Sequence, residues 1–167
     1  MFQLRKYNLR LSLLIAAIVV LADQWSKALV VRRMHVDGSC VNSCGSFDLI
    51  PHWLAVTPEP NHHGAFGFFG NSNLLLIVMA VIVLTIFWFS FRDVAKRSRL
   101  VQVAFGLILG GAIGNVIDRI HWGYVVDFID FYRYPEYWRF TFNVADSCIT
   151  GGVILLLWSS LATRRQR

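Results

Sequence analysis

Two segments in the C-terminal part of the chain are apolar enough to cross a membrane and yet carry carboxylate and amide side chains. Between Gly110 and Gly152 these segments hold Asn115, Asp118, Arg119, Asn143 and Asp146, and the connection between them holds Asp127 and Asp130. A charged side chain at membrane depth costs roughly 2.5–3.5 kcal/mol on insertion scales. Such residues are therefore candidates for a functional site.

Two of the acids lack an obvious basic partner. Ion pairs can neutralise other acids, in the combinations Asp23 with Lys27 and Asp118 with Arg119. Asp127 and Asp146 are left over, and two close carboxylates cannot both ionise cheaply, so they should share one proton. Such a pair can activate water with one oxygen and protonate a carbonyl or a leaving amine with another. That chemistry hydrolyses peptide bonds.

A further acid competes with Asp127 for this role. Val125 to Tyr134 is predicted to be a strand, and alternation with period two puts Asp127 on one face and Asp130 on the other. Only one of these two acids can face the rest of the candidate site. Periodicity alone does not say which.

The composition indicates an integral membrane protein. The 167 residues are 56% hydrophobic and only 16% charged, with a mean hydropathy of +0.52, and the apolar residues form long runs. About 20 apolar residues of helix cross a bilayer, and four stretches qualify: about 11–31, 73–91, 100–120 and 142–162. We predict one domain over 1–167, an all-α bundle of four transmembrane helices. Its longer connections are 32–72 and 121–141.

The basic residues predict the orientation of this bundle. They gather before the first span, between the second and third, and after the fourth, at Arg5, Lys6, Arg10, Arg92, Lys96, Arg97, Arg99, Arg164, Arg165 and Arg167. By the positive-inside rule these segments, including both termini, are cytoplasmic. The net charge of +6 therefore reflects membrane topology, and we expect no nucleic-acid partner. Both longer connections, and the polar residues of the candidate site, then fall at the outer side.

Small residues indicate how the helices pack. The third span contains Gly106, Gly110, Gly111 and Gly114, at spacings of three and four that let helices approach closely in lipid. We expect this helix at the centre of the bundle, with Gly151 and Gly152 of the fourth span packed against it. Asn143 is placed to cap the fourth helix at its N-terminus.

The outer connections also carry residues that could support other chemistry. Phe47 to Val56 predicts one or two short strands lying along the membrane surface. Cys40 and Cys44 could form a disulfide on the oxidising side of a membrane. His62, His63 and Glu59 invite a metal-dependent protease as an alternative, although their spacing matches no zinc motif. A small transporter that uses the buried acids as a proton relay is a second alternative.

Four ordered motifs together resemble one family, the lipoprotein signal peptidase or signal peptidase II. They are Asp23-x-x-x-Lys27, Gly114-Asn115-x-x-Asp118-Arg119, Gly123-x-Val125-Val126-Asp127-Phe128 and Phe142-Asn143-x-Ala145-Asp146-Ser147. The resemblance extends over nearly the whole chain and includes the four spans. Each motif alone would carry little weight.

The resemblance implies an aspartic endopeptidase of the bacterial inner membrane, with its active site facing the periplasm. Its substrate would be a prolipoprotein whose cysteine carries diacylglycerol, cut on the amino side of that cysteine. Substrate and membrane lipids are the implied partners, and no metal or cofactor is needed. A small extracytoplasmic β-sheet lying on the membrane is implied as well. We expect a monomer, because one subunit suffices for the site.

Carried over by position, the resemblance makes Asp127 and Asp146 the catalytic acids and excludes Asp130. Supporting polar residues would be Asn115, Asp118, Arg119 and Asn143, with Asp23 and Lys27 bracing the first span. The family pattern Asn-x-Gly-Ala-Ala-Phe is altered here to Asn61-His62-His63-Gly64-Ala65-Phe66. Either Asn61 or His62 could therefore take the family's substrate-holding asparagine position.

Overall fold

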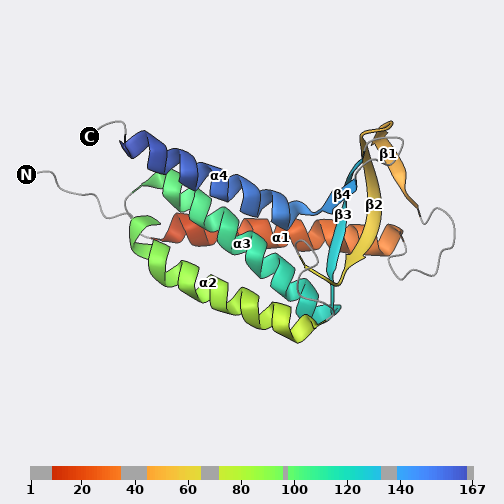
Figure 1. Ribbon diagram of the computed structural model, residues 1–167, viewed down its shortest axis with the longest axis horizontal. Helices are drawn as coiled ribbons and strands as arrows, with labels where there is room; N and C mark the ends of the chain where they lie inside the picture. The colour runs from red at the N-terminus through yellow and green to blue at the C-terminus, as the bar shows by residue number, and fades with distance from the viewer. Residues whose placement is uncertain (1–8, 35–44, 65–71, 96–97, 133–138, 165–167) are drawn as a thin grey trace, which may run out of the picture.

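The computed structural model describes residues 9–34, 45–64, 72–95, 98–132 and 139–164 (Figure 1). Four helices in this part of the chain are long and apolar enough to cross a membrane. Their bounds are α1 Arg10–Arg33, α2 Asn73–Ala95, α3 Arg99–His121 and α4 Val144–Arg164. The predicted four-helix membrane fold is thus confirmed. The predicted end of the second span, at residue 91, is four residues too early, and the predicted start of the fourth, at residue 142, is two residues too early.

The helices lie side by side, with a small sheet at one end of the bundle (Figure 1). The first turn of α1 and the last turn of α4 both lie at the end opposite the sheet. Half of the apolar window of α3 is buried, against 6% of that of α2. The exposed apolar side chains of α2 and α4, such as Leu74 and Trp158, suit contact with lipid.

Glycines bring α1 and α4 onto α3, which confirms the predicted central helix. A Cβ on Gly106 or Gly110 would lie 2.6 or 2.7 Å from a backbone carbonyl oxygen of α1. Gly111 lies against the carbonyl of Ala145 in α4, and Gly152 of α4 lies against α3 in turn. Any larger residue at these positions would push the helices apart. Gly151 has no such neighbour within 4 Å, so the prediction for it is wrong.

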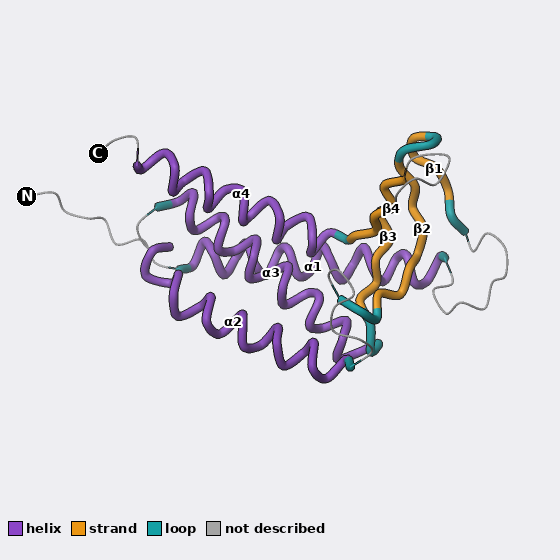
Figure 2. The backbone as a smooth tube through the Cα atoms, viewed as in Figure 1, coloured by secondary structure: helices purple, strands orange, loops and turns teal. Residues whose placement is uncertain are grey.

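Four antiparallel strands form the sheet, in the spatial order β1-β2-β3-β4. Their bounds are β1 Phe47–Ile50, β2 Leu54–Asn61, β3 Val125–Tyr132 and β4 Arg139–Phe142. The segment predicted as one or two strands is thus a hairpin. The strands run across the direction of the helices (Figure 2).

Strand β4 was missed by the sequence analysis, which placed Phe142 at the start of the fourth span and the three residues before it in the connection 121–141. Its four residues pair with β3, with Phe142 opposite Ile129 and Arg139 opposite Tyr132. So short a strand has little signal of its own, because it forms only against its partner. Its effect is to bring the chain directly from β3 to the start of α4.

Strand β3 is an inner strand of the sheet, between β2 and β4, and it contacts both α1 and α3. Phe128 packs against Val30 and Met34 near the end of α1, and Val126 is fully buried. Asp127 is buried as well and points to the other face of the strand, where the cavity described below lies. The packing of β3 on α1 therefore fixes the height at which Asp127 meets the bundle.

Candidate active site

A cavity of about 440 Å³ lies where α3 and α4 meet the sheet. Asp127 of β3 and Asp146 of α4 both line it. The other polar residues in its wall include Asn61, Asn115 and Arg119, which come from β2 and α3. Residues far apart in the sequence thus contribute to one site at the sheet end of the bundle.

Asp127 is held by two asparagine amides. Asn143 Nδ2 donates to its Oδ1 at 2.7 Å, and Asn61 Nδ2 donates to its Oδ2 at 2.9 Å. Asp127 is only 1% exposed, so these contacts replace the water that its carboxyl group would otherwise bind. Asn61 thus contacts Asp127 directly, whereas the ring of His62 lies 5.1 Å from that of Tyr124.

Asp146 is held at the N-terminus of α4. Asn115 Nδ2 donates to its Oδ1 at 2.8 Å, and the backbone N–H of Asn143 donates to its Oδ2 at 3.3 Å. In return, Asn143 Oδ1 accepts the backbone N–H of Asp146 at 2.9 Å. This reciprocal pair is a capping box, which confirms the predicted cap at Asn143. The cap fixes the rotamer of the acid that points into the cavity.

A buried ionic cluster lies next to the two acids. The ammonium of Lys27 is 2.8 Å from Asp23 Oδ2, 2.8 Å from Asp118 Oδ2 and 3.0 Å from Asn115 Oδ1. The expected pair of Asp23 with Lys27 is confirmed. The expected pair of Asp118 with Arg119 is wrong, because Asp118 faces α1 and takes Lys27 as its partner.

The acids of this cluster also bind the backbone beside the cavity acids. Asp23 Oδ1 accepts the N–H of Ala145 at 3.0 Å, and Asp118 Oδ2 accepts the N–H of Val126 at 3.1 Å. Ala145 and Val126 each immediately precede one of the two cavity acids. The cluster therefore fixes the backbone of α4 next to Asp146 and the backbone of β3 next to Asp127.

Arg119 lies in the cavity wall rather than in the ionic cluster. Neighbouring residues of a helix point about 100° apart, so Asp118 and Arg119 face different sides of α3. The side chain is 8% exposed, and its Nη1 has no hydrogen-bond partner among the described residues. A buried guanidinium with a spare donor beside two carboxylates can bind a carbonyl or a developing oxyanion.

Asp130 belongs to a separate contact on the sheet. Arg139 Nε lies 3.0 Å from both of its carboxylate oxygens, and the same guanidinium lies 3.5 Å from Glu59. Asp130 does not line the cavity. The choice that periodicity left open is thus decided by which face of β3 packs on α1.

Gln24 is a polar contact that the sequence analysis missed. Its Nε2 donates to Asp118 Oδ1 at 2.8 Å and to the carbonyl of Gly114 at 3.2 Å. Its position between Asp23 and Lys27 in an otherwise apolar span was an available signal. Gln24 ties α1 to α3 beside the ionic cluster.

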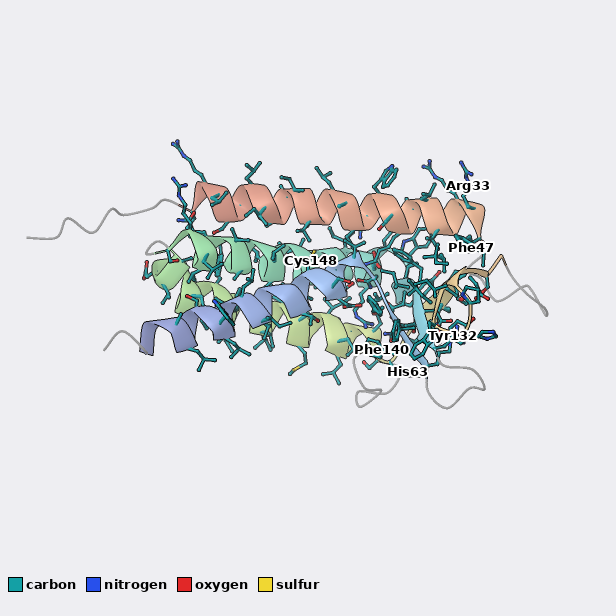
Figure 3. All side chains as sticks on the ribbon, turned by 90° about the horizontal axis from the view of Figure 1, so that it is seen from above. Arg33, Phe47, His63, Tyr132, Phe140 and Cys148 are labelled. Atoms are coloured by element: carbon teal, nitrogen blue, oxygen red, sulfur yellow. The ribbon has the colours of Figure 1, made fainter. Side chains whose placement is uncertain are left out.

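The structure bears on the metal alternative but not on the predicted disulfide. Within the described ranges, no group of three or more His, Cys, Asp or Glu side chains is placed to hold a metal ion. Figure 3 shows Cys148 in the helical bundle and His63 near the sheet, and Cys148 is a free, partly buried thiol. Cys40 and Cys44 lie outside the described residues.

The electrostatics of the cavity favour a protonated acid near neutral pH. Burial raises the pKa of Asp127 to about 7, and the negative charge of Asp146 adds to this effect. The amide hydrogen bonds from Asn61 and Asn143 and the charge of Lys27 act in the opposite direction. The pair can therefore hold one proton and one negative charge at the same time.

Comparisons with known proteins agree with this architecture. Residues 15–162 match the family model described as signal peptidase (SPase) II. Lipoprotein signal peptidases of Staphylococcus aureus strains JH9 and Newman are each 37% identical over 158 residues, which cover 92% of this chain and 89% of the relative.

Two solved structures are also similar, and both are described as bacterial membrane enzymes determined by the in meso method. One has a TM-score of 0.83 and 34% identity, and the match covers 99% of this chain and 96% of that chain. The other has a TM-score of 0.76 and 35% identity, with coverage of 96% and 98%.

Proposed function

This chain belongs to the signal peptidase II family, and we propose that Asp127 and Asp146 form the catalytic dyad with which it removes signal peptides from prolipoproteins. It is a multi-pass bacterial membrane enzyme and an aspartic endopeptidase. The observation that carries the dyad is that both carboxylates line one cavity and are each held there by asparagine amides.

The dyad acts with a single proton. The ionised carboxylate takes a proton from water, and the water oxygen attacks the carbonyl carbon of the scissile peptide. The protonated carboxyl group gives its proton to the carbonyl oxygen. When the tetrahedral intermediate collapses, one of its hydroxyl groups returns a proton to the dyad as the C=O bond forms, the C–N bond breaks and the leaving amine takes up a proton from the dyad. The two carboxyl groups then share one proton again.

The supporting residues hold the reacting groups in place. Asn61, Asn115 and Asn143 orient the carboxylates through the hydrogen bonds described above. Arg119 lines the cavity, and its positive charge stabilises the negative charge that develops on the carbonyl oxygen of the substrate. Asp23, Lys27 and Asp118 act behind them as a brace.

The substrate is a prolipoprotein whose cysteine carries diacylglycerol, cut on the amino side of that cysteine. The cavity wall mixes the polar groups with apolar side chains such as Phe140 and Ile149. Such a wall suits a lipidated peptide that is already in the bilayer, so that neither its acyl chains nor its helix has to leave the membrane.

The site faces the periplasm and both termini are cytoplasmic. The basic residues outside and between the spans support this orientation. The start of α1 and the end of α4 also lie opposite the sheet (Figure 1). The chain works as one domain over 1–167 and as a monomer, since the described residues of one chain supply asparagine donors to both acids of the dyad.

Reconstitution of the purified protein in lipid with a diacylglyceryl prolipoprotein tests this function. Mass spectrometry should find the lipidated cysteine as the new N-terminus, and the unlipidated precursor should stay uncut. A strong chelator should not change the rate. Loss of activity with the chelator would favour the metal alternative, and ion flux without cleavage would favour the transporter.

The rate of cleavage should fall as the pH rises above about 7. The pKa of Asp127 is raised to about 7, so the dyad keeps its shared proton below that pH and loses it above. A doubly ionised dyad has no proton to give to the carbonyl oxygen. The measurement is kcat/KM from pH 5 to 9 in the reconstituted system. A profile that still rises at pH 9 would contradict the shared proton.

A further inference from the structure

Three asparagine amides surround the dyad, and the oxygen of each is already taken by a fixed donor. Asn61 Oδ1 accepts the backbone N–H groups of His63 at 3.2 Å and Gly64 at 2.9 Å. Asn143 Oδ1 accepts the backbone N–H of Asp146 at 2.9 Å. Because an N–H group can only donate, these contacts determine which end of each amide is the oxygen. The Nδ2 of both amides is then left to donate to the dyad.

Asn115 differs from the other two because a charged side chain holds its oxygen. Lys27 Nζ donates to Asn115 Oδ1 at 3.0 Å, and Asn143 Nδ2 lies 3.2 Å from the same oxygen. The other end of the amide, Nδ2, donates to Asp146 Oδ1 at 2.8 Å. Two donors thus hold Asn115 Oδ1, and Lys27 is the closer and the only charged one of the two, so the contact of Asp146 with Asn115 depends on the position of Lys27.

Each N–H group of the Lys27 ammonium has a hydrogen-bond acceptor. The ammonium has three N–H donors and three acceptors, which are Asp23 Oδ2, Asp118 Oδ2 and Asn115 Oδ1. The residue is 3% exposed. Two carboxylates balance its charge, and the third contact, with a neutral amide, adds no charge balance. What that third contact does is select the orientation of the amide.

We propose that Lys27 is a positioning residue of the dyad, which acts through Asn115 by keeping the amide nitrogen of Asn115 turned towards Asp146. The proposal depends on the assignment of Asp127 and Asp146 as the dyad. Without the ammonium, the longer contact with Asn143 Nδ2 is left to hold Oδ1 among the described residues, and the amide can turn over and place Oδ1 against Asp146 Oδ1. Two acceptors would then meet, and the shared proton would be drawn to Asp146 to lie between them. Lys27 thus keeps Asp146 available as the base.

Charged groups on every neighbouring element contribute to the same balance. They are Asp23 on α1, Asp118 and Arg119 on α3, Asp127 on β3 and Asp146 on α4. Removing the positive charge of Lys27 therefore affects the field of the whole cavity. A test has to separate this general effect from the specific contact with Asn115.

A double-mutant cycle between Lys27→Met and Asn115→Leu makes this separation in the reconstituted enzyme. Each single change should lower kcat about tenfold or more and leave KM within about twofold, and the low-pH limb of kcat/KM should move to higher pH. The double variant should be no slower than the slower single variant, because both changes remove the same chain of contacts from Lys27 through Asn115 to Asp146. Multiplicative losses would overturn the proposal.

Gln24→Leu is the matched control for the cycle. Gln24 lies on the same helix and donates to Asp118, but among the described residues it makes no hydrogen bond to Asn115. Its effect should multiply with that of Asn115→Leu. Coupling as strong as that of Lys27 would also overturn the proposal, since it would show a general effect of the ionic cluster.

Two further variants keep the proposal testable if Lys27→Met does not fold. Lys27→Met with Asp118→Asn keeps the net charge of the cluster and can replace the single variant in the cycle. Asn115→Asp keeps an acceptor for Lys27 but has no N–H for Asp146, so it should be as slow as Asn115→Leu. Full activity of Asn115→Asp would overturn the proposal. Activity of a dyad variant would instead overturn the proposed function.

Discussion

Asp127→Asn and Asp146→Asn should each reduce signal-peptide removal by about a thousandfold or more, as expected for the loss of a group that transfers the proton. An amide cannot take a proton from water, and it cannot share one with the remaining acid. The two losses should not multiply in the double variant, because either change alone destroys the dyad. Single-turnover cleavage of the lipidated precursor measures all three rates.

Asp130→Asn is the matched control for the dyad variants. It makes the same change three residues along the same strand, at an acid that faces Arg139 instead of the cavity. Most of the activity should remain, with some loss of thermal stability because the Asp130 contact with Arg139 is weakened. Normal cleavage by Asp127→Asn together with loss of cleavage in Asp130→Asn would refute the assignment of Asp127 to the dyad.

Asn143→Ala should lower kcat about a hundredfold, a loss typical of removing one preorganised donor from an active site. Asn143 Nδ2 donates to Asp127 Oδ1, and its Oδ1 caps the helix that carries Asp146. One side chain therefore positions both acids. The change also removes the cap, which costs about 1 kcal/mol of stability.

Asn143→Ser separates these two roles. Serine caps a helix about as well as asparagine, but it has no amide to donate to Asp127. The variant should recover the thermal stability lost in Asn143→Ala and stay about as slow. Recovery of the rate along with the stability would mean that Asn143 acts only as a cap.

The local patterns of the chain predicted the framework of the fold. The length of an apolar run is decided by the thickness of the bilayer, which is the same for every helix, and so the four spans were found. The glycine spacing in α3 and the cap at Asn143 involve residues within one or two turns. The four motifs identified the family, which the match over residues 15–162 confirms.

The partners of the polar groups could not be predicted in the same way. Asp118 has Arg119 beside it in the sequence, but the rotation of α3 against α1 gives it Lys27 and Gln24. The contact of Asn61 with Asp127 likewise depends on the pairing of β2 with β3. Sequence distance carries no information about such contacts.

By itself, the sequence determined which segments enter the membrane, which helix lies at the centre and which residue types are available for chemistry. The tertiary structure decided which face of β3 meets the cavity, how β4 leads into α4, and which ammonium and amides surround the two acids. The physical reason is one of range. Burial in lipid and capping act along the chain, whereas a buried ion takes its partner from whichever element packs against it.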